Sequence, residues 1–363
     1  MKHLHTVLRV LVGGLFIFSG LIKVNDPVGT SIKLEEYFEV FATQFAGFFH
    51  LFVPLALPLA VILVVMEVVL GIAIIINYQP KLTQYTILGL IVFFTFLTGY
   101  SAITNTVTDC GCFGDAIKLT PWESFTKDII LLIMIVVIMV LDKPKKEKAN
   151  MMEHGVIGAS SLLCLILAFT AINHLPFIDF RAYKIGAHIP TNMQPSADFI
   201  YEYVVSKDGK EYTFSEYPND PEYKFVSMTH VNPEAGPKIT DFAVWDDNGD
   251  FTEEVFKGNK LFVILYDVTQ SNLEGIADIN TLVQSLNGKV EVYALTASAA
   301  ATYEEFAQAN SFNIKYYYTD ATVLKTIARS NPGLWLLQNG TVKGKWHHND
   351  VPNYSEVLDL LKL

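Results

Sequence analysis

Cysteine is scarce in this chain, since only three of its 363 residues are cysteines, at positions 110, 112 and 164. This number excludes a disulfide-rich scaffold, and any thiol chemistry must centre on Cys110 and Cys112. Basic residues are few as well: 26 Lys and Arg stand against 37 Asp and Glu, for a net charge of -11. A protein that grips phosphates needs clustered Lys and Arg, so the composition argues against nucleic acid as a partner.

Long apolar runs are plentiful, and they lie in the first half of the chain. Crossing a bilayer takes about 20 residues per helix. Five segments are long and apolar enough, namely residues 4–24, 49–78, 82–103, 121–141 and 155–175. The second half is polar and acidic. The sequence therefore predicts a multi-domain protein, with a helical membrane bundle in contact with lipid and a water-soluble part.

The basic residues predict the orientation of the bundle. The strongest cluster, Lys143–Lys148, lies between the fourth and fifth spans, and Lys2, Arg9 and Lys81 fall on the same side. Positively charged loops stay in the cytoplasm. The loop over residues 104–120 and everything after about residue 175 are then outside, which in a bacterium with its inner membrane means the periplasm, where disulfides persist.

The outer loop carries the most specific motif, Thr-Asp-Cys-Gly-Cys-Phe-Gly-Asp at residues 108–115. Thr120, Pro121 and Glu123 predict a capped helix start directly after it, so the loop is a short, rigid connection. Cysteines two residues apart form a strained, easily reduced disulfide, which suits thiol exchange. Cys110 and Cys112 are therefore candidate catalytic residues.

Other interpretations of the cysteine pair stay open. The flanking carboxylates of Asp109 and Asp115 disfavour a thiolate, so neither cysteine is an obvious attacker. The pair is alternatively a static staple of the loop. Half of a metal site is a weaker alternative, because the neighbourhood supplies no two further ligands.

Glu67 lies in the middle of the second span, where an ionised carboxylate costs several kcal/mol unless it is paired or protonated. One interpretation is a proton relay or a quinone contact, with Arg9 and Lys23 as further quinone-binding residues. The other is a structural hydrogen bond to Arg9, Ser19 or Lys23. Cys164 lies in an apolar run of the fifth span and is expected to pack there.

Several of these motifs resemble known families. They are Arg9-x3-Gly13, Phe18–Lys23, Asp26-Pro27, Glu67–Gly71 and the Asp109–Asp115 loop. Together they resemble the DoxX and MauE families of four-helix membrane proteins over roughly residues 1–142, with the span in residues 143–178 as an added fifth helix. MauE-like proteins are implicated in making disulfides in a periplasmic enzyme subunit with a thioredoxin-like partner, and DoxX relatives are linked to quinone-coupled sulfur oxidation. The resemblance implies electron transfer between periplasmic thiols and the quinone pool.

The soluble part begins with a linker and strand-rich segment at residues 179–255. Strands and helices then alternate over residues 256–363, with strands expected at 261–266, 290–295, 314–318, 334–338 and 341–346. This order resembles an α/β thioredoxin fold. Ser330-Asn331-Pro332-Gly333 resembles its loop with a cis proline, which makes Asn331 and Pro332 candidate binding residues.

The soluble part departs from that fold where thioredoxins carry their Cys-x-x-Cys motif. This chain reads Asp267-Val268-Thr269-Gln270-Ser271-Asn272 there. Without a thiolate the domain cannot perform thiol exchange, so it is expected to dock a partner or cover the membrane cysteines. His347 and His348 are adjacent on a strand and are expected on opposite faces, as part of a surface turn and not of a metal site.

Two classes of function follow from the sequence. The first is a membrane thiol and quinone oxidoreductase in which Cys110 and Cys112 cycle and the soluble domain presents a periplasmic client. The second is a non-catalytic accessory subunit of an envelope protein complex, in which the bundle anchors a redox-inactive thioredoxin-like module. The cysteine pair favours the first class, and the missing Cys-x-x-Cys motif favours the second.

Overall fold

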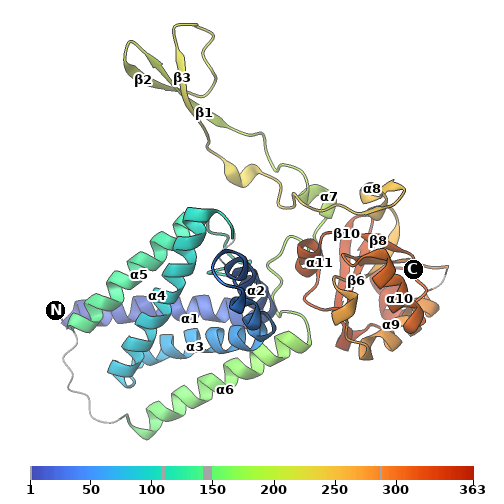
Figure 1. Ribbon diagram of the computed structural model, residues 1–363, viewed down its shortest axis with the longest axis horizontal. Coiled ribbons are helices and arrows are strands. Elements are labelled where there is room, and N and C mark those ends of the chain that lie inside the picture. Colours follow the sequence, from blue (N-terminus) through green and yellow to red (C-terminus); the bar gives the residue numbers. More distant parts are fainter. Residues whose placement is uncertain (1, 108–110, 142–148, 287) are drawn as a thin grey trace. The chain divides into compact units, whose positions relative to one another are not determined.

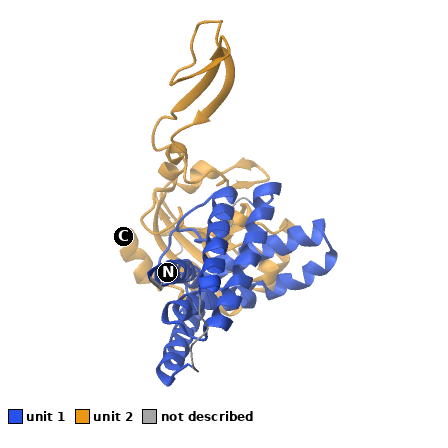
Figure 2. Ribbon diagram, turned by 90° about the vertical axis from the view of Figure 1, so that its left-hand side faces the viewer, with its two compact units in different colours: residues 1–180 blue, residues 181–363 orange. Residues whose placement is uncertain are grey.

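The computed structural model describes residues 2–107, 111–141, 149–286 and 288–363. The chain divides into two compact units, Met1–Phe180 and Arg181–Leu363 (Figure 2). The first unit is helical and the second is a sheet-rich α/β domain (Figure 1).

The first unit consists of long apolar helices joined by short connections. Its elements are α1 (Lys2–Asn25), α2 (Pro27–Gln44), the 3-10 helix η1 (Gly47–Leu55), α3 (Ala56–Ile76), α4 (Pro80–Thr104), α5 (Pro121–Leu141) and α6 (Met151–Asn173). Among the described residues, five helical segments are long and apolar enough to cross a membrane, at His3–Asn25, Gly47–Ile76, Pro80–Thr104, Pro121–Leu141 and Met151–Asn173. They coincide with the five spans expected from the sequence, and the chain is a multi-pass membrane protein.

Two glycines bring α1 and α3 into close contact. A Cβ atom on Gly13 would lie 2.6 Å from the carbonyl oxygen of Gly71, and a Cβ on Gly71 would lie 2.7 Å from the carbonyl oxygen of Gly13. No side chain fits at either position, so the two backbones touch where they cross. Small residues at such crossings are how membrane helices gain packing energy without a hydrophobic driving force.

The helix that follows the cysteine loop starts at the expected capping box. The Thr120 amide donates to Glu123 Oε2 over 2.8 Å, and the Glu123 amide donates to Thr120 Oγ1 over 3.3 Å. These bonds satisfy amides that a helix start leaves without partners. They fix the point at which the outer loop ends.

The second unit contains a small antiparallel sheet in the order β2-β1-β3, built from β1 (Tyr201–Lys207), β2 (Lys210–Phe214) and β3 (Lys224–His230). Asp208 and Gly209 connect β1 to β2 with φ values of 53° and 74°. A two-residue hairpin turn of this kind needs two positive φ angles, which explains the Asp-Gly pair.

The larger sheet of this unit has seven strands in the order β10-β9-β6-β7-β8-β4-β5. The strands are β4 (Trp245–Asp246), β5 (Gly249–Asp250), β6 (Asn259–Leu265), β7 (Glu291–Thr296), β8 (Tyr316–Tyr318), β9 (Gly333–Gln338) and β10 (Thr341–His347). Strands β6, β7 and β8 are parallel, whereas β9 runs antiparallel to β6. The connecting helices are α7 (Ile189–Asn192), α8 (Thr252–Val255), α9 (Glu274–Ser285), α10 (Ala300–Ala309), α11 (Ala321–Ile327) and α12 (Tyr354–Leu361), with 3-10 turns η2 (Pro233–Ala235), η3 (Val268–Gln270) and η4 (His348–Asp350).

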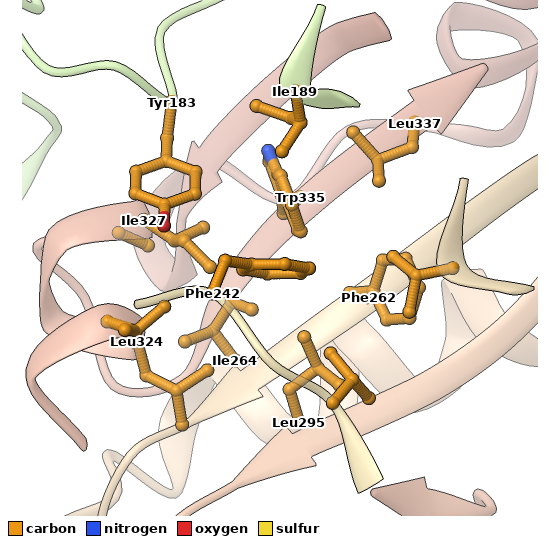
Figure 3. Close-up of a cluster of buried hydrophobic side chains, with 14 of the residues drawn as sticks. Tyr183, Ile189, Phe242, Phe262, Ile264, Leu295, Leu324, Ile327, Trp335 and Leu337 are labelled. Carbon is orange, nitrogen blue, oxygen red and sulfur yellow. The ribbon is translucent and has the colours of Figure 1, made fainter. Parts of the chain in front are cut away.

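Strand β6 lies inside the sheet and is buried on both faces. Phe262 and Ile264 point into one hydrophobic cluster, and Leu261, Val263 and Leu265 point into the other. A continuous apolar run is typical of a strand covered on both sides. The first of these clusters is drawn in Figure 3.

The segment at residues 179–255 forms the small sheet and also contributes to the core and to the large sheet of the α/β domain. Tyr183, Ile189 and Phe242 lie in the cluster around Trp335 (Figure 3), and β4 and β5 extend the large sheet. The Ile189 amide also donates to the carbonyl of Gly340 over 2.9 Å. Much of this segment therefore belongs to the α/β domain.

Two local expectations have different outcomes. The Asn331–Pro332 bond is cis, as expected from the sequence. The expectation that His347 and His348 point to opposite faces is wrong, because their ring centroids are 4.0 Å apart. Strand β10 ends at His347 and η4 begins at His348, so the alternation of a strand no longer applies there.

Candidate functional site

The described part of the cysteine loop resumes at Gly111, and Cys110 with its neighbours Thr108 and Asp109 lies outside the described residues. Cys112 is half-buried. A turn follows it, in which the Gly114 amide donates to the carbonyl of Gly111 over 3.1 Å. Phe113 is buried and lies 5.7 Å from the ring of Phe18 on α1. The loop is thus packed against the first span.

Ser19 ties the loop to the interior of the bundle. Its Oγ lies 2.8 Å from the carbonyl oxygen of Cys112 and 3.1 Å from Glu67 Oε2. Ser19 is on α1 and Glu67 is on α3, so one hydroxyl joins two spans and the loop above them. No local sequence pattern predicts this contact, because its partners are far apart in the chain.

Glu67 forms a buried ion pair with Lys23. Lys23 Nζ lies 2.6 Å from Glu67 Oε1, and the two side chains are 8% and 4% exposed. The ammonium also lies 5.0 Å from the centroid of the Phe94 ring, within range of a cation–π contact. A buried charge is tolerated in a membrane helix when a partner of opposite sign is this close. The hydrogen bonds to Ser19 and Lys23 are those expected under the structural interpretation of Glu67.

A second charged pair lies on α5, below the loop. Lys127 Nζ is 2.7 Å from Asp128 Oδ1, and Thr98 on α4 donates to Asp128 Oδ2 over 3.0 Å. The Lys127 ammonium also lies 5.4 Å from the centroid of the Phe113 ring and interacts electrostatically with Cys112 and Glu67. This pair was not among the site residues predicted from the sequence, although adjacent opposite charges inside a predicted span are a signal for it.

Lys127 also lines a groove of about 440 Å³ that is formed by α5 and by Leu15 of α1. The groove has an aliphatic part and a more polar part. It is lined by Leu15, Trp122, Glu123, Thr126, Lys127, Ile130 and Leu131. Its size falls within the range of small-molecule sites.

Arg9 is not part of this cluster. Its Nε donates to the carbonyl of Ile74 and its Nη2 to that of Ile75, each over 2.8 Å. These are among the last carbonyls of α3, which a helix end leaves without intrahelical partners. Since Lys23 follows Arg9 by 14 residues in the same helix, the two lie about 21 Å apart along the axis at 1.5 Å per residue. The structure therefore brings together Glu67, Lys23 and Cys112, and places Arg9 elsewhere.

In the α/β domain, Asn331 is hydrogen-bonded to the segment at residues 267–272, which stands where thioredoxins carry their Cys-x-x-Cys motif. The Asn272 amide donates to the carbonyl of Asn331 over 2.9 Å, and Asn331 Nδ2 donates to the carbonyl of Asp267 over 2.6 Å. The backbone carbonyl of Asn331, just before Pro332, therefore already accepts a hydrogen bond from within the domain.

His348 and Ser330 complete this corner of the domain. Their Nδ1 and Oγ atoms lie 2.9 Å apart, and the His348 amide also donates to Ser330 Oγ over 3.1 Å. Burial lowers the pKa of His348, while a hydrogen bond with the Pro332 carbonyl and the carboxylates of Asp350 and Glu274 oppose this effect. Within the described ranges, no group of three or more His, Cys, Asp and Glu side chains is placed to hold a metal ion.

The comparison with protein families adds a finding for the membrane part. Residues 1–141 match the family model of methylamine utilisation protein MauE. The membrane part of the chain is similar to MauE. The matched region contains α1 to α5 with the cysteine loop, and we refer to residues 1–141 as the MauE-like region. No curated protein and no solved structure matches the chain.

Proposed function

We propose that this chain is a membrane thiol oxidoreductase that exchanges electrons between periplasmic thiols and the quinone pool through Cys110 and Cys112, in the inner membrane of a bacterium. The observation that carries the proposal is the bond between Ser19 and the Cys112 carbonyl, which sets the loop over the buried Lys23–Glu67 pair. The bonds of Ser19 fix the loop to two spans and hold Cys112 at one place above them. The match of residues 1–141 to MauE supports the same assignment.

The proposed reaction has two balanced steps. In the first, a client dithiol reduces the Cys110–Cys112 disulfide by thiol–disulfide exchange, which leaves a client disulfide and two thiols on the loop. In the second, the two thiols form the disulfide again and give up two electrons and two protons. A bound quinone would supply the two-electron oxidant and become the quinol.

The groups that would hold a quinone differ from those suggested by the sequence. Lys23 and Glu67 bond to each other, and Arg9 binds the end of α3. The groove lined by Lys127 fits better. The Lys127 side chain is 24% exposed, against 8% for Lys23, and its ammonium keeps further N–H donors for a carbonyl oxygen beside the bond to Asp128. The aliphatic side chains of the groove suit an apolar tail, and these are Leu15, Ile130 and Leu131.

For the α/β domain we propose a thioredoxin-like fold that docks a protein client or an envelope complex. The interior position of β6, the parallel β6-β7-β8 order and the cis Asn331–Pro332 bond support this fold. Cysteine is absent from residues 181–363, so the domain would bind without exchanging thiols. Because the Asn331 carbonyl already accepts a bond from Asn272, client docking would use other groups.

The proposal is tested by the redox state of Cys110 and Cys112 in membranes, read by thiol-alkylation mass shifts with and without added quinone. The pair should become oxidised only when quinone is present. Cys110→Ser and Cys112→Ser should each abolish client oxidation at unchanged protein abundance. Cys164→Ala is the matched control, because Cys164 lies on α6 and packs in a hydrophobic cluster with Val24, Val64 and Val68.

A non-catalytic accessory subunit is the second candidate, favoured by the cysteine-free α/β domain. In that case the bundle anchors a binding module, and the cysteine pair only braces the loop. Full cellular function in both single cysteine variants would support this candidate and exclude the first.

A further inference from the structure

Ser19 has one hydroxyl hydrogen but two acceptors within bonding distance. They are the carbonyl oxygen of Cys112 at 2.8 Å and Glu67 Oε2 at 3.1 Å. A hydroxyl donates a single hydrogen bond, and an ionised carboxylate can only accept. While Glu67 is ionised, the loop and the carboxylate therefore compete for the same hydrogen.

The competition ends when Glu67 is neutral. A protonated carboxyl group has a hydrogen of its own and can donate it to Ser19 Oγ, which leaves the Ser19 hydrogen for the Cys112 carbonyl. We propose that Ser19 is a positioning residue that couples the charge of Glu67 to the hold on the loop at Cys112. The loop is held more tightly when Glu67 is neutral and more loosely when it is ionised.

Two cationic groups lie near Glu67. Lys23 Nζ on α1 lies 2.6 Å from Glu67 Oε1. Lys127 on α5, which is paired with Asp128, also interacts electrostatically with Glu67. With Glu67 in the ion pair that the structure shows, the Ser19 hydrogen is shared between two acceptors.

This inference rests on the proposed function for its purpose, since it places the segment that carries the reacting thiol under the control of a buried charge. Its geometry and its test do not involve electron transfer. Failure of the coupling would leave the proposed reaction untouched, and failure of the reaction would leave the coupling measurable.

The test is amide hydrogen exchange of the loop peptide at residues 111–118, measured in the full-length protein in lipid nanodiscs. The peptide contains the amides of Gly114 and Ala116, which are bonded within the turn and exchange when it opens. Ser19→Ala should speed exchange about fivefold, as expected for the loss of one hydrogen bond. Ser19→Thr keeps the hydroxyl and should exchange as the unmodified protein does.

Glu67→Gln separates coupling from simple support, and it is made together with Lys23→Met so that no buried ammonium loses its partner. The glutamine Nε2 donates to Ser19, so the Cys112 carbonyl gains the Ser19 hydrogen. Exchange should then slow about twofold or more, the opposite direction to Ser19→Ala. The slowing should vanish when Ser19→Ala is added to this pair of substitutions. Ser161→Ala is the control, since that hydroxyl donates to the carbonyl of Ile157 in its own helix.

Two outcomes would overturn the inference: unchanged exchange in Ser19→Ala, or faster exchange in the variant with both Lys23→Met and Glu67→Gln. If this variant does not fold, acidification of the unmodified protein replaces it. Protection of the loop peptide, corrected for the intrinsic exchange rate, must then rise as Glu67 takes up a proton. The same rise must be absent in Ser19→Ala. Because Asp115 in the loop is present in both proteins, its titration would affect both and is cancelled by the comparison. A rise of equal size in both proteins would refute the coupling.

Discussion

Lys23 and Glu67 show that a membrane helix can contain a charged side chain when a side chain of opposite charge is paired with it. Each residue alone would be an unpaired charge among apolar helices, at a cost of several kcal/mol. Together they lie 2.6 Å apart and are nearly inaccessible to solvent. The pair therefore need not add stability to be retained, because removal of either partner is what costs most.

Lys23→Met should destabilise the MauE-like region strongly, by about 3–5 kcal/mol, because it leaves the Glu67 carboxylate buried without its cation. The measurement is the thermal unfolding midpoint of the purified protein in detergent. The double variant Lys23→Met, Glu67→Gln removes both charges and should recover most of the loss. A double variant as unstable as the single one would show that the charge pair is not the cause.

His348 should make the stability of the α/β domain fall in acid. Burial lowers its pKa in the fold below the ordinary 6.5. The unfolded chain therefore binds the proton at a higher pH than the folded chain does. The free energy of unfolding has its full value above pH 6.5. It falls progressively as the pH drops from there through the pKa of His348 in the folded state. Unfolding midpoints measured above and below this pH should show the loss, and His348→Gln, which cannot charge, should show a smaller one.

At the scale of elements, the crossing of α1 and α3 is set by glycine. Gly13 and Gly71 face each other so closely that neither has room for a Cβ atom. One turn beyond the crossing, α1 presents Phe16 to the core and then Ser19 and Lys23 to α3. The close approach of the two helices is what brings those polar groups within reach of Glu67.

Gly13→Ala should destabilise the bundle by about 1–3 kcal/mol, the usual cost of forcing an extra carbon into a packed site. The neighbouring Gly14 is the matched control, because a Cβ there would meet no atom within 4 Å. Gly14→Ala should be neutral or slightly stabilising, since alanine favours the helix. Thermal unfolding in the same detergent compares the two. Equal losses in both variants would contradict the packing argument.

The elements that could be predicted from the sequence are those with a local cause. The five spans follow from runs of apolar residues, and the start of α5 follows from Thr120, Pro121 and Glu123. The order of strands and helices from β6 to α12 follows from patterning and turn residues. Residues 179–255 contain the expected strands, but their contribution to the core of the α/β domain was not predicted. Tyr183, Ile189 and Phe242 reach that core from irregular backbone with no periodic signal.

The candidate site was predictable only in part. Glu67 stood out because a carboxylate in an apolar helix is rare. Its bond to Ser19 and the second bond from Ser19 to Cys112 depend on how three segments meet, which no local pattern encodes. Arg9 was grouped with Glu67 because both are polar groups in spans, but spacing along α1 separates them.

At the scale of the whole molecule, the orientation of the chain can be tested directly. The basic Lys143–Lys148 segment predicts a cytoplasmic connection between the fourth and fifth spans, so residues 177–363 should be periplasmic. Protease added to intact spheroplasts of a bacterial host should remove the α/β domain. The basic segment should be cut only after lysis. Survival of the domain on intact spheroplasts would reverse the orientation.

The contact between Gly13 and Gly71 also affects which positions a genetic screen for loss of activity would identify in this protein. Any substitution at either glycine forces apart the helices that carry Ser19 and Glu67, although neither glycine has a reactive group. A screen scored by loss of activity would therefore rank both glycines beside Cys110 and Cys112. Scoring the amount of protein in the membrane alongside activity would separate the two classes, because only the cysteine variants should accumulate normally.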